Sequence, residues 1–162
     1  MPTGAHHAHL LIGSNIEPVE NVRLALLELC HHGIIKRISR VWQTPAYGSQ
    51  GPDFLNLAVE LITPLPLESL KKEALSAIED TLGRRRTSDK NAPRTMDIDV
   101  ILFDGEVLDQ TVWTRIHTAI TIADILPELV DPNTQESLPT IAARLAEEHP
   151  VRERNDVLPL ME

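Results

Sequence analysis

Cysteine is almost absent from this sequence, and so are membrane-length apolar runs and the features of a secretory signal. The single cysteine, Cys30, cannot form an internal disulfide, which fits a reducing compartment. The first residues, MPTGAHHAHLLIG, lack the basic region and long apolar run of a secretory signal. His6, His7 and His9 lie near this terminus, which we expect to be flexible, so they predict no metal site. We expect a soluble, cytoplasmic protein without a membrane partner.

Positive charge is also scarce. The formal net charge is −9, and the 15 Lys and Arg residues form no long run. This balance argues against nucleic acid or another large polyanion as a partner, but it allows a small phosphate substrate where basic residues gather locally. The sequence also lacks G-x-x-x-x-G-K-[ST], so any nucleotide must be held by something other than a P-loop.

The length of 162 residues suits one domain with a substantial core. Neither a linker nor an internal repeat divides the chain, so we expect a single domain over residues 1–162. Apolar runs predict strands at 8–13, 34–42 and 54–63 and within 91–105. Apolar residues at helical spacing predict helices at 18–33 and 67–83.

This order of elements predicts an α+β fold with a ferredoxin-like βαββαβ core. In such a core an antiparallel sheet carries helices packed against it. Beyond it, a shorter region around IADILPELVD and a helix near 139–149 predict a short C-terminal helical extension.

The stretch NAPRTMDIDVILFDG places two carboxylates in an apolar strand. Side chains alternate across a strand, so Asp97 and Asp99 share one face, with Cα atoms roughly 7 Å apart. Unpaired, they would repel each other, whereas a hard divalent cation such as Mg²⁺ accepts one or two carboxylates together with phosphate oxygens and water. The alternative is a strand that emerges at the end of a sheet with both aspartates solvated.

Arginines flank this strand in the sequence. Arg84, Arg85 and Arg86 end the preceding helix, and Arg94 lies three residues before Asp97. The arginine fork suits phosphate oxygens, and an acidic pair beside such a cluster is typical of metal-assisted phosphoryl transfer. A helix C-terminus also favours cations for structural reasons, so the cluster alone does not decide between the two interpretations.

Aromatic residues make up only 3% of the chain, and three of the five lie in WQTPAYGSQGPDF. Aromatic side chains in a loop rich in turns are candidates for stacking on a flat heterocycle, with Thr44 and Asn56 available to bind its edges. For Trp42 we favour a place in the core. For Phe54, together with Asn56, we favour ligand binding.

Taken in order, the motifs IGSN, TPAYG, GPDFLN, LGRRR, PRTMDIDVILFDG and IHT resemble the 6-hydroxymethyl-7,8-dihydropterin pyrophosphokinase family. The resemblance implies transfer of pyrophosphate from ATP to the pterin alcohol in folate biosynthesis, giving AMP and the pterin pyrophosphate. It also implies two Mg²⁺ ions held by Asp97 and Asp99, and phosphates steadied by Arg84 and Arg94.

The resemblance further implies two groups of binding residues. The implied pterin-site residues are Gly13, Thr44, Pro45, Tyr47, Phe54 and Asn56. The implied ATP-site residues are Glu79, Arg84, Arg94, Val100, Thr114 and His117. We expect the chain to act as a monomer or weak homodimer.

The sequence departs from the family pattern on the nucleotide side. Ile116 precedes His117 where proline is usual, and TAITIADILPEL is too short for the family's R-x-F element. Val112 stands where an arginine is expected, and Asn91 where Trp is common. Three interpretations stay open: a working pyrophosphokinase, a pterin- or nucleotide-binding relative without transfer, and a domain without a ligand.

Overall fold

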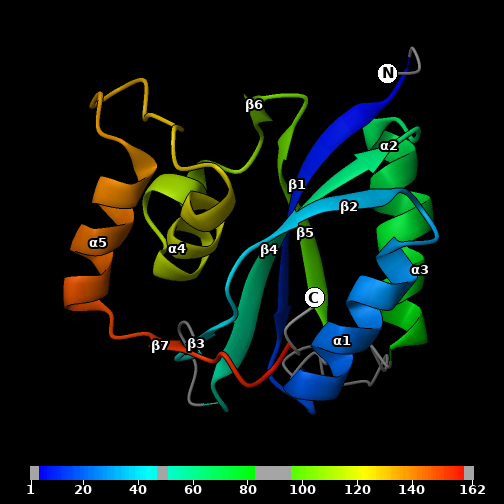
Figure 1. The fold of residues 1–162 in the computed structure, drawn as a ribbon, viewed down its shortest axis with the longest axis horizontal. Helices are drawn as coiled ribbons and strands as arrows, with labels where there is room; N and C mark the ends of the chain where they lie inside the picture. The colour runs from blue at the N-terminus through cyan, green and yellow to red at the C-terminus, as the bar shows by residue number, and fades with distance from the viewer. Residues whose placement is uncertain (1–3, 47–50, 83–95, 159–162) are drawn as a thin grey trace.

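A computed structural model describes residues 4–46, 51–82 and 96–158. Within these ranges seven strands form one antiparallel sheet (Figure 1). The strands are β1 (His6–Ser14), β2 (Ile34–Ile38), β3 (Trp42–Thr44), β4 (Phe54–Thr63), β5 (Asp97–Phe103), β6 (Glu106–Val107) and β7 (Arg152–Glu153). The helices are α1 (Pro18–Leu29), α2 (Leu67–Ser69), the π-helical η1 (Leu70–Leu75), α3 (Ser76–Thr81), the 3-10 helix η2 (Gln110–Trp113), α4 (Ile116–Ile125) and α5 (Leu138–Glu148). The predicted ferredoxin-like order is confirmed.

Strand β1 lies in the middle of the sheet, where it pairs with β4 on one side and β5 on the other. Both of its faces are covered, which explains why its sequence is a continuous apolar run rather than an alternating one. Leu10 and Ile12 pack into one core, and Leu11 packs into the other. The expectation of a flexible start was wrong, because β1 begins at His6 and His9 is only 6% exposed.

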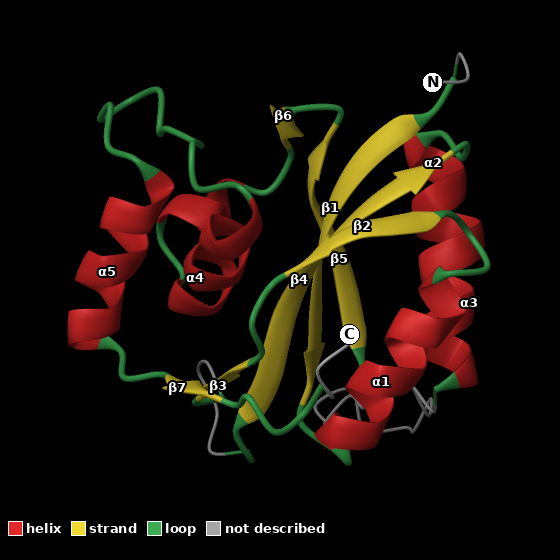
Figure 2. Cartoon of the chain, in the orientation of Figure 1, coloured by secondary structure: helices red, strands yellow, loops and turns green. Residues whose placement is uncertain are grey.

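Helices cover both faces of the sheet, as Figure 2 shows. On one face, α1 and α3 bury Val22, Leu29 and Ile78 against the sheet. On the other face, α4 and α5 bury a second set of apolar residues, Ile122 and Leu138 among them. No helix in the described ranges is both long and apolar enough to cross a membrane.

The segment predicted as one strand over 34–42 is two strands. Both pair with β4, and Ser39 lies between them. The Ser39 backbone N–H donates to the carbonyl oxygen of Ala58 at 2.9 Å, while the Ala58 N–H donates to the Ser39 hydroxyl oxygen at 2.7 Å. The serine hydroxyl thus replaces one backbone acceptor of the ladder, and the chain changes direction there without leaving a buried N–H unpaired.

The helix predicted to run to Gly33 ends at Leu29. Gly33 has a different role, because a Cβ atom there would lie 2.2 Å from the carbonyl oxygen of Ile62. The glycine therefore allows the chain to pass closely over the backbone of β4 as it enters β2.

Candidate active site

The two aspartates of β5 lie at an open edge of the sheet. Ile98 and Val100 face the α1 and α3 layer, so Asp97 and Asp99 face the side of α4. Strand β6 pairs only with Leu102 and Phe103, and among the described residues no strand covers the edge of β5 beside the aspartates. Within the described residues, the carboxylates are therefore accessible from the α4 face and from the edge, where both line cavities.

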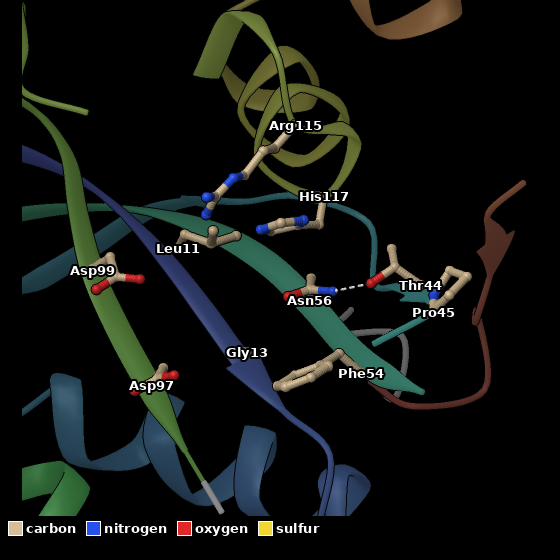
Figure 3. A pocket seen from close by; sticks show the side chains of 10 residues that line it. All are labelled: Leu11, Gly13, Thr44, Pro45, Phe54, Asn56, Asp97, Asp99, Arg115 and His117. Atoms are coloured by element: carbon tan, nitrogen blue, oxygen red, sulfur yellow. Dashed lines mark hydrogen bonds between the residues drawn. The ribbon is translucent and has the colours of Figure 1, made fainter. Parts of the chain in front are cut away.

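A first cavity, of about 350 Å³, opens on the α4 side. Its size is within the range of small-molecule sites. Strands β1, β3, β4 and β5 and the start of α4 contribute to it, as Figure 3 shows. Its lining residues are Leu11, Gly13, Thr44, Pro45, Phe54, Asn56, Asp97, Asp99, Arg115 and His117.

A buried amide forms the floor of this cavity. Asn56 Nδ2 donates to Thr44 Oγ1 at 2.7 Å, and both residues are buried. Gly13 is the partner of Asn56 across the β1–β4 ladder, and a Cβ atom at Gly13 would lie 2.8 Å from Asn56 Oδ1. The amide is thus held in one orientation by a hydroxyl on one side and a glycine backbone on the other. Phe54, two residues earlier on β4, supplies a flat apolar surface beside it.

Arg115 and His117 reach the cavity from the beginning of α4. Burial lowers the pKa of the His117 imidazole, and the nearby Arg115 charge lowers it further, while Asp109 acts in the opposite direction. The imidazole is therefore neutral at neutral pH, with one nitrogen able to donate and the other able to accept.

A second cavity, of about 480 Å³, follows the edge of β5. Its lining residues are Lys71, Leu75, Glu79, Asp97, Ile98, Asp99, Val100, Leu108, Asp109 and Gln110. Lys71 and Leu75 belong to the π-helical η1, a type of turn that is frequent at functional sites, and Glu79 follows on α3. Both aspartates line both cavities, so the two spaces meet at the carboxylates.

Glu79 connects a helix to the aspartate strand. Its side chain is buried, and its Oε2 accepts the backbone N–H of Ile98 at 3.1 Å. Ile98 lies between the two aspartates, so this contact fixes α3 against the part of β5 that presents them. It also shows that the backbone groups of Ile98 point to the edge, as do those of Val100 two residues later.

The structure brings most of the implied site residues together. The implied pterin-site residues that line the first cavity are Gly13, Thr44, Pro45, Phe54 and Asn56. Of the implied ATP-site residues, Glu79 and Val100 line the second cavity, and His117 lines the first. Thr114 is exposed at the end of η2 and lines neither. Tyr47, Arg84 and Arg94 lie outside the described residues.

Sequence reasoning missed eight of the lining residues: Leu11, Lys71, Leu75, Ile98, Leu108, Asp109, Gln110 and Arg115. Leu11 belongs to an apolar strand and looked like core, while Lys71 looked like an exposed helix residue. Arg115 lies between η2 and α4, and no motif includes it. The fold brings each of them to a cavity, and no periodicity along the chain reports this.

The two carboxylates offer few protein ligands for a metal ion. In the part of the chain that the structure describes, no group of three or more His, Cys, Asp or Glu side chains could enclose a metal ion. An all-protein cage is therefore not available from these residues. Two carboxylates beside a space for phosphate do fit Mg²⁺, which keeps water and substrate oxygens among its ligands.

Comparison with known proteins agrees with these features. A model of the 7,8-dihydro-6-hydroxymethylpterin-pyrophosphokinase (HPPK) family matches residues 9–127. The 2-amino-4-hydroxy-6-hydroxymethyldihydropteridine pyrophosphokinase of Synechocystis sp. is 34% identical over 149 residues, covering 85% of this chain and 75% of that protein. Its counterpart of the same name from Bacillus subtilis is 36% identical over 107 residues, covering 63% of this chain and 62% of that protein.

A likeness also extends to solved structures. The crystal structure of Plasmodium falciparum HPPK-DHPS wild type with pteroate superposes with a TM-score of 0.65 at 12% identity. The match covers 89% of this chain and 43% of that chain, so this chain spans less than half of that longer protein. At this identity the likeness concerns the fold.

Proposed function

Because the chain belongs to the 7,8-dihydro-6-hydroxymethylpterin-pyrophosphokinase family, we propose that it transfers the pyrophosphoryl group of ATP to 6-hydroxymethyl-7,8-dihydropterin. The hydroxymethyl oxygen forms a bond to the β-phosphorus of ATP, and the bond from that phosphorus to the α,β-bridging oxygen breaks. AMP leaves with the bridging oxygen, and the hydroxyl proton is released. The observation that carries this proposal is that Asp97 and Asp99 line both cavities.

The first cavity suits the pterin. Phe54 offers a ring on which a flat heterocycle can stack, and the buried Asn56 amide can bind both a donor and an acceptor on its edge. Thr44 fixes the orientation of that amide through its 2.7 Å hydrogen bond. The alcohol group of a pterin seated there would point toward the aspartates.

The second cavity suits the nucleotide. It runs along the open edge of β5, where the backbone groups of Val100 can contact a base, while Lys71 adds a positive charge to the lining. The polyphosphate of ATP would then extend to the junction at Asp97 and Asp99. In this arrangement the protein acts mainly by positioning, since it holds the acceptor oxygen and the β-phosphorus in one line.

Asp97 and Asp99 are the residues that would hold Mg²⁺, and we propose two ions. Bound there with ATP, the metal would neutralise phosphate charge and acidify the attacking hydroxyl. The carboxylates themselves determine where the phosphates can lie, because they are carried by a regular strand. The hydrogen bond from the Ile98 N–H to Glu79 Oε2 holds this strand against α3.

We also propose that one chain suffices for the reaction, as a monomer or weak homodimer in the cytoplasm. Both cavities are lined by residues of a single chain. The two helical layers pack on one shared sheet, which supports residues 1–162 acting as a single domain.

The test is to incubate the protein with ATP, Mg²⁺ and 6-hydroxymethyl-7,8-dihydropterin and to follow AMP and the pterin pyrophosphate by mass spectrometry. We expect both products in equal amounts. The variant Asp97→Ala should lower the rate by at least about 100-fold, the effect of removing a main electrostatic contact to the reacting group. Its unfolding midpoint should stay close to that of the unaltered protein, because Asp97 is only half-buried.

Asp80→Asn is a matched control, because Asp80 is an exposed carboxylate on α3 outside both cavity linings. It should react at the normal rate. If the unaltered protein gives no AMP yet is stabilised against heat by ATP or the pterin, the chain is a binding protein without transfer. An Asp97→Ala variant that reacts at the normal rate would show that the aspartates do not take part in the mechanism as proposed.

A further inference from the structure

We propose that Arg115 is a phosphate-binding residue that holds the transferred pyrophosphoryl group on the acceptor side of the aspartates. This inference rests on the proposed function and adds a residue that no motif of the sequence contains. It also predicts a property that can be measured without turnover: Arg115 should favour binding of the pterin product over the pterin substrate.

The position of Arg115 is built into the fold. Its carbonyl oxygen accepts the N–H groups of Ala119 at 2.8 Å and Thr118 at 3.2 Å, so its backbone is fixed by the first turn of α4. Its side chain lines the first cavity together with His117. Figure 3 shows both side chains extending from the start of α4 toward the strand that carries Leu11, with the guanidinium group turned to the side of Asp99.

The charges of the cavity give Arg115 its role. Among the described residues that line the first cavity, Arg115 is the single basic Arg or Lys, and Asp97 and Asp99 are the acidic residues. Pyrophosphate that arrives on the acceptor brings further negative charge to this space. An arginine fork can bind two of its oxygens at once, which a neutral imidazole at His117 cannot do.

Among the described lining residues, each cavity has one Lys or Arg side chain. Lys71 lines the nucleotide cavity and Arg115 lines the acceptor cavity, with the aspartates between them. The pyrophosphoryl group that moves from ATP to the pterin therefore leaves the side of Lys71 and arrives on the side of Arg115. Of the two pterin species, only the product carries phosphate for Arg115 to contact.

The experiment measures the dissociation constants of the pterin alcohol and of the pterin pyrophosphate, with Mg²⁺ present, by fluorescence titration or calorimetry. For Arg115→Gln we expect the alcohol to bind within about threefold of normal. The pyrophosphate should bind about 10- to 100-fold more weakly, as for a lost charged hydrogen bond. Arg115→Lys keeps the charge without the fork, so its loss should be intermediate.

Arg144→Gln is the matched control. Arg144 is exposed on α5, where it pairs with Glu136, and it lines neither cavity. The substitution removes the same charge from the molecule, so it should leave both dissociation constants unchanged. A product affinity that fell in this variant too would mean that net charge, and not a contact, sets the affinity.

Equal weakening of alcohol and product by Arg115→Gln would overturn the proposal, because it would mean that the residue merely shapes the pterin cavity. Unchanged binding of both would overturn it as well. These outcomes differ from a failure of the proposed function, which would appear in the unaltered protein as absence of AMP. An unaltered protein that binds neither pterin species would contradict both proposals.

Discussion

Gly13 lies directly beneath the Asn56 amide, and this contact leaves no room for a side chain. The Cβ atom of an alanine would lie 2.8 Å from Asn56 Oδ1, so the amide would have to move from the position that Thr44 holds. We expect Gly13→Ala to weaken pterin binding by about tenfold, the cost of one misplaced hydrogen bond. ATP binding should not change. Calorimetric titration with each ligand measures both.

A double-mutant cycle checks the cause of that loss. If Gly13→Ala acts through the amide, adding it to Asn56→Ala should cost little further pterin affinity, because the displaced group is already gone. Additive losses would contradict this account. They would show that the new methyl group blocks the pterin itself.

Different signals identified different site residues. Asp97 and Asp99 could be assigned from the sequence because strand alternation places both on one face and because carboxylates in an apolar strand are unusual. Gly13 came from the family resemblance, and its physical reason, the close approach to Asn56, depends on the pairing of β1 with β4. Arg115 could not be found in this way, since its place in the cavity depends on how α4 sits over the sheet.

A cluster around Asp124 fixes α4 to β3. The guanidinium group of Arg40 donates to both carboxylate oxygens of Asp124, with Nη2 at 2.8 Å from Oδ1, and Trp42 Nε1 donates to Oδ2 at 3.1 Å. Arg40 also lies 4.7 Å above the Trp42 ring. Because α4 carries His117 and β3 carries Thr44, this cluster sets the distance across the first cavity.

We therefore expect Asp124→Ala to lower the free energy of unfolding by about 1–3 kcal/mol, since charged hydrogen bonds to a mostly buried carboxylate are lost. Pterin affinity should fall as well, because the start of α4 is less firmly held. Urea denaturation and pterin titration measure the two effects. Glu136→Gln, just before α5, breaks the ion pair with the exposed Arg144 away from the cavity and should change stability by less than about 1 kcal/mol. A stable Asp124→Ala with normal affinity would contradict this role.

Elements with a clear period were predictable, and those fixed by distant contacts were not. Strand β4 matches its predicted bounds of 54–63 because both ends carry turn residues. Helix α4 begins well before the apolar stretch that the sequence suggested, since it is buried on several sides and shows no single apolar stripe. Strand β7 has two residues and exists only because it pairs with β3.

The arrangement of layers explains where the site lies. Each face of the sheet has its own apolar core, and β1 separates the two. Helices α1 and α3 bury Ile98 and Val100 of β5 on one face, whereas on the other face Asp97 is only half-buried and Asp99 is exposed. The aspartate end of β5 therefore stays open beside α4, at the margin between a rigid sheet and a helix held by polar contacts.

Stability should depend on pH through His9, which is buried on the α4 side of β1. Neither of its ring nitrogens has a hydrogen-bond partner among the described residues. Burial lowers its pKa; Glu60 and Glu128 oppose this, while His7 and Arg37 add to it. Because the unfolded chain keeps the ordinary pKa of about 6.5, it takes up a proton first as the pH falls. Stability is therefore full above about pH 6.5 and declines below it.

His9→Met removes this titration and places an apolar side chain of similar size in the buried position. We therefore expect this variant to lose less stability between pH 7.5 and pH 5.5 than the unaltered protein. Urea denaturation at the two pH values measures the difference. Burial raises the pKa of Glu60, but its hydrogen bond with His7 and nearby cations lower it more, so the net pKa is lowered. The contribution of Glu60 to folding stability is therefore lost only at more acidic pH. The exposed His149 provides a control, since His149→Gln should keep the normal pH dependence. Identical pH dependence in His9→Met and the unaltered protein would mean that the buried imidazole stays neutral at no cost to the fold.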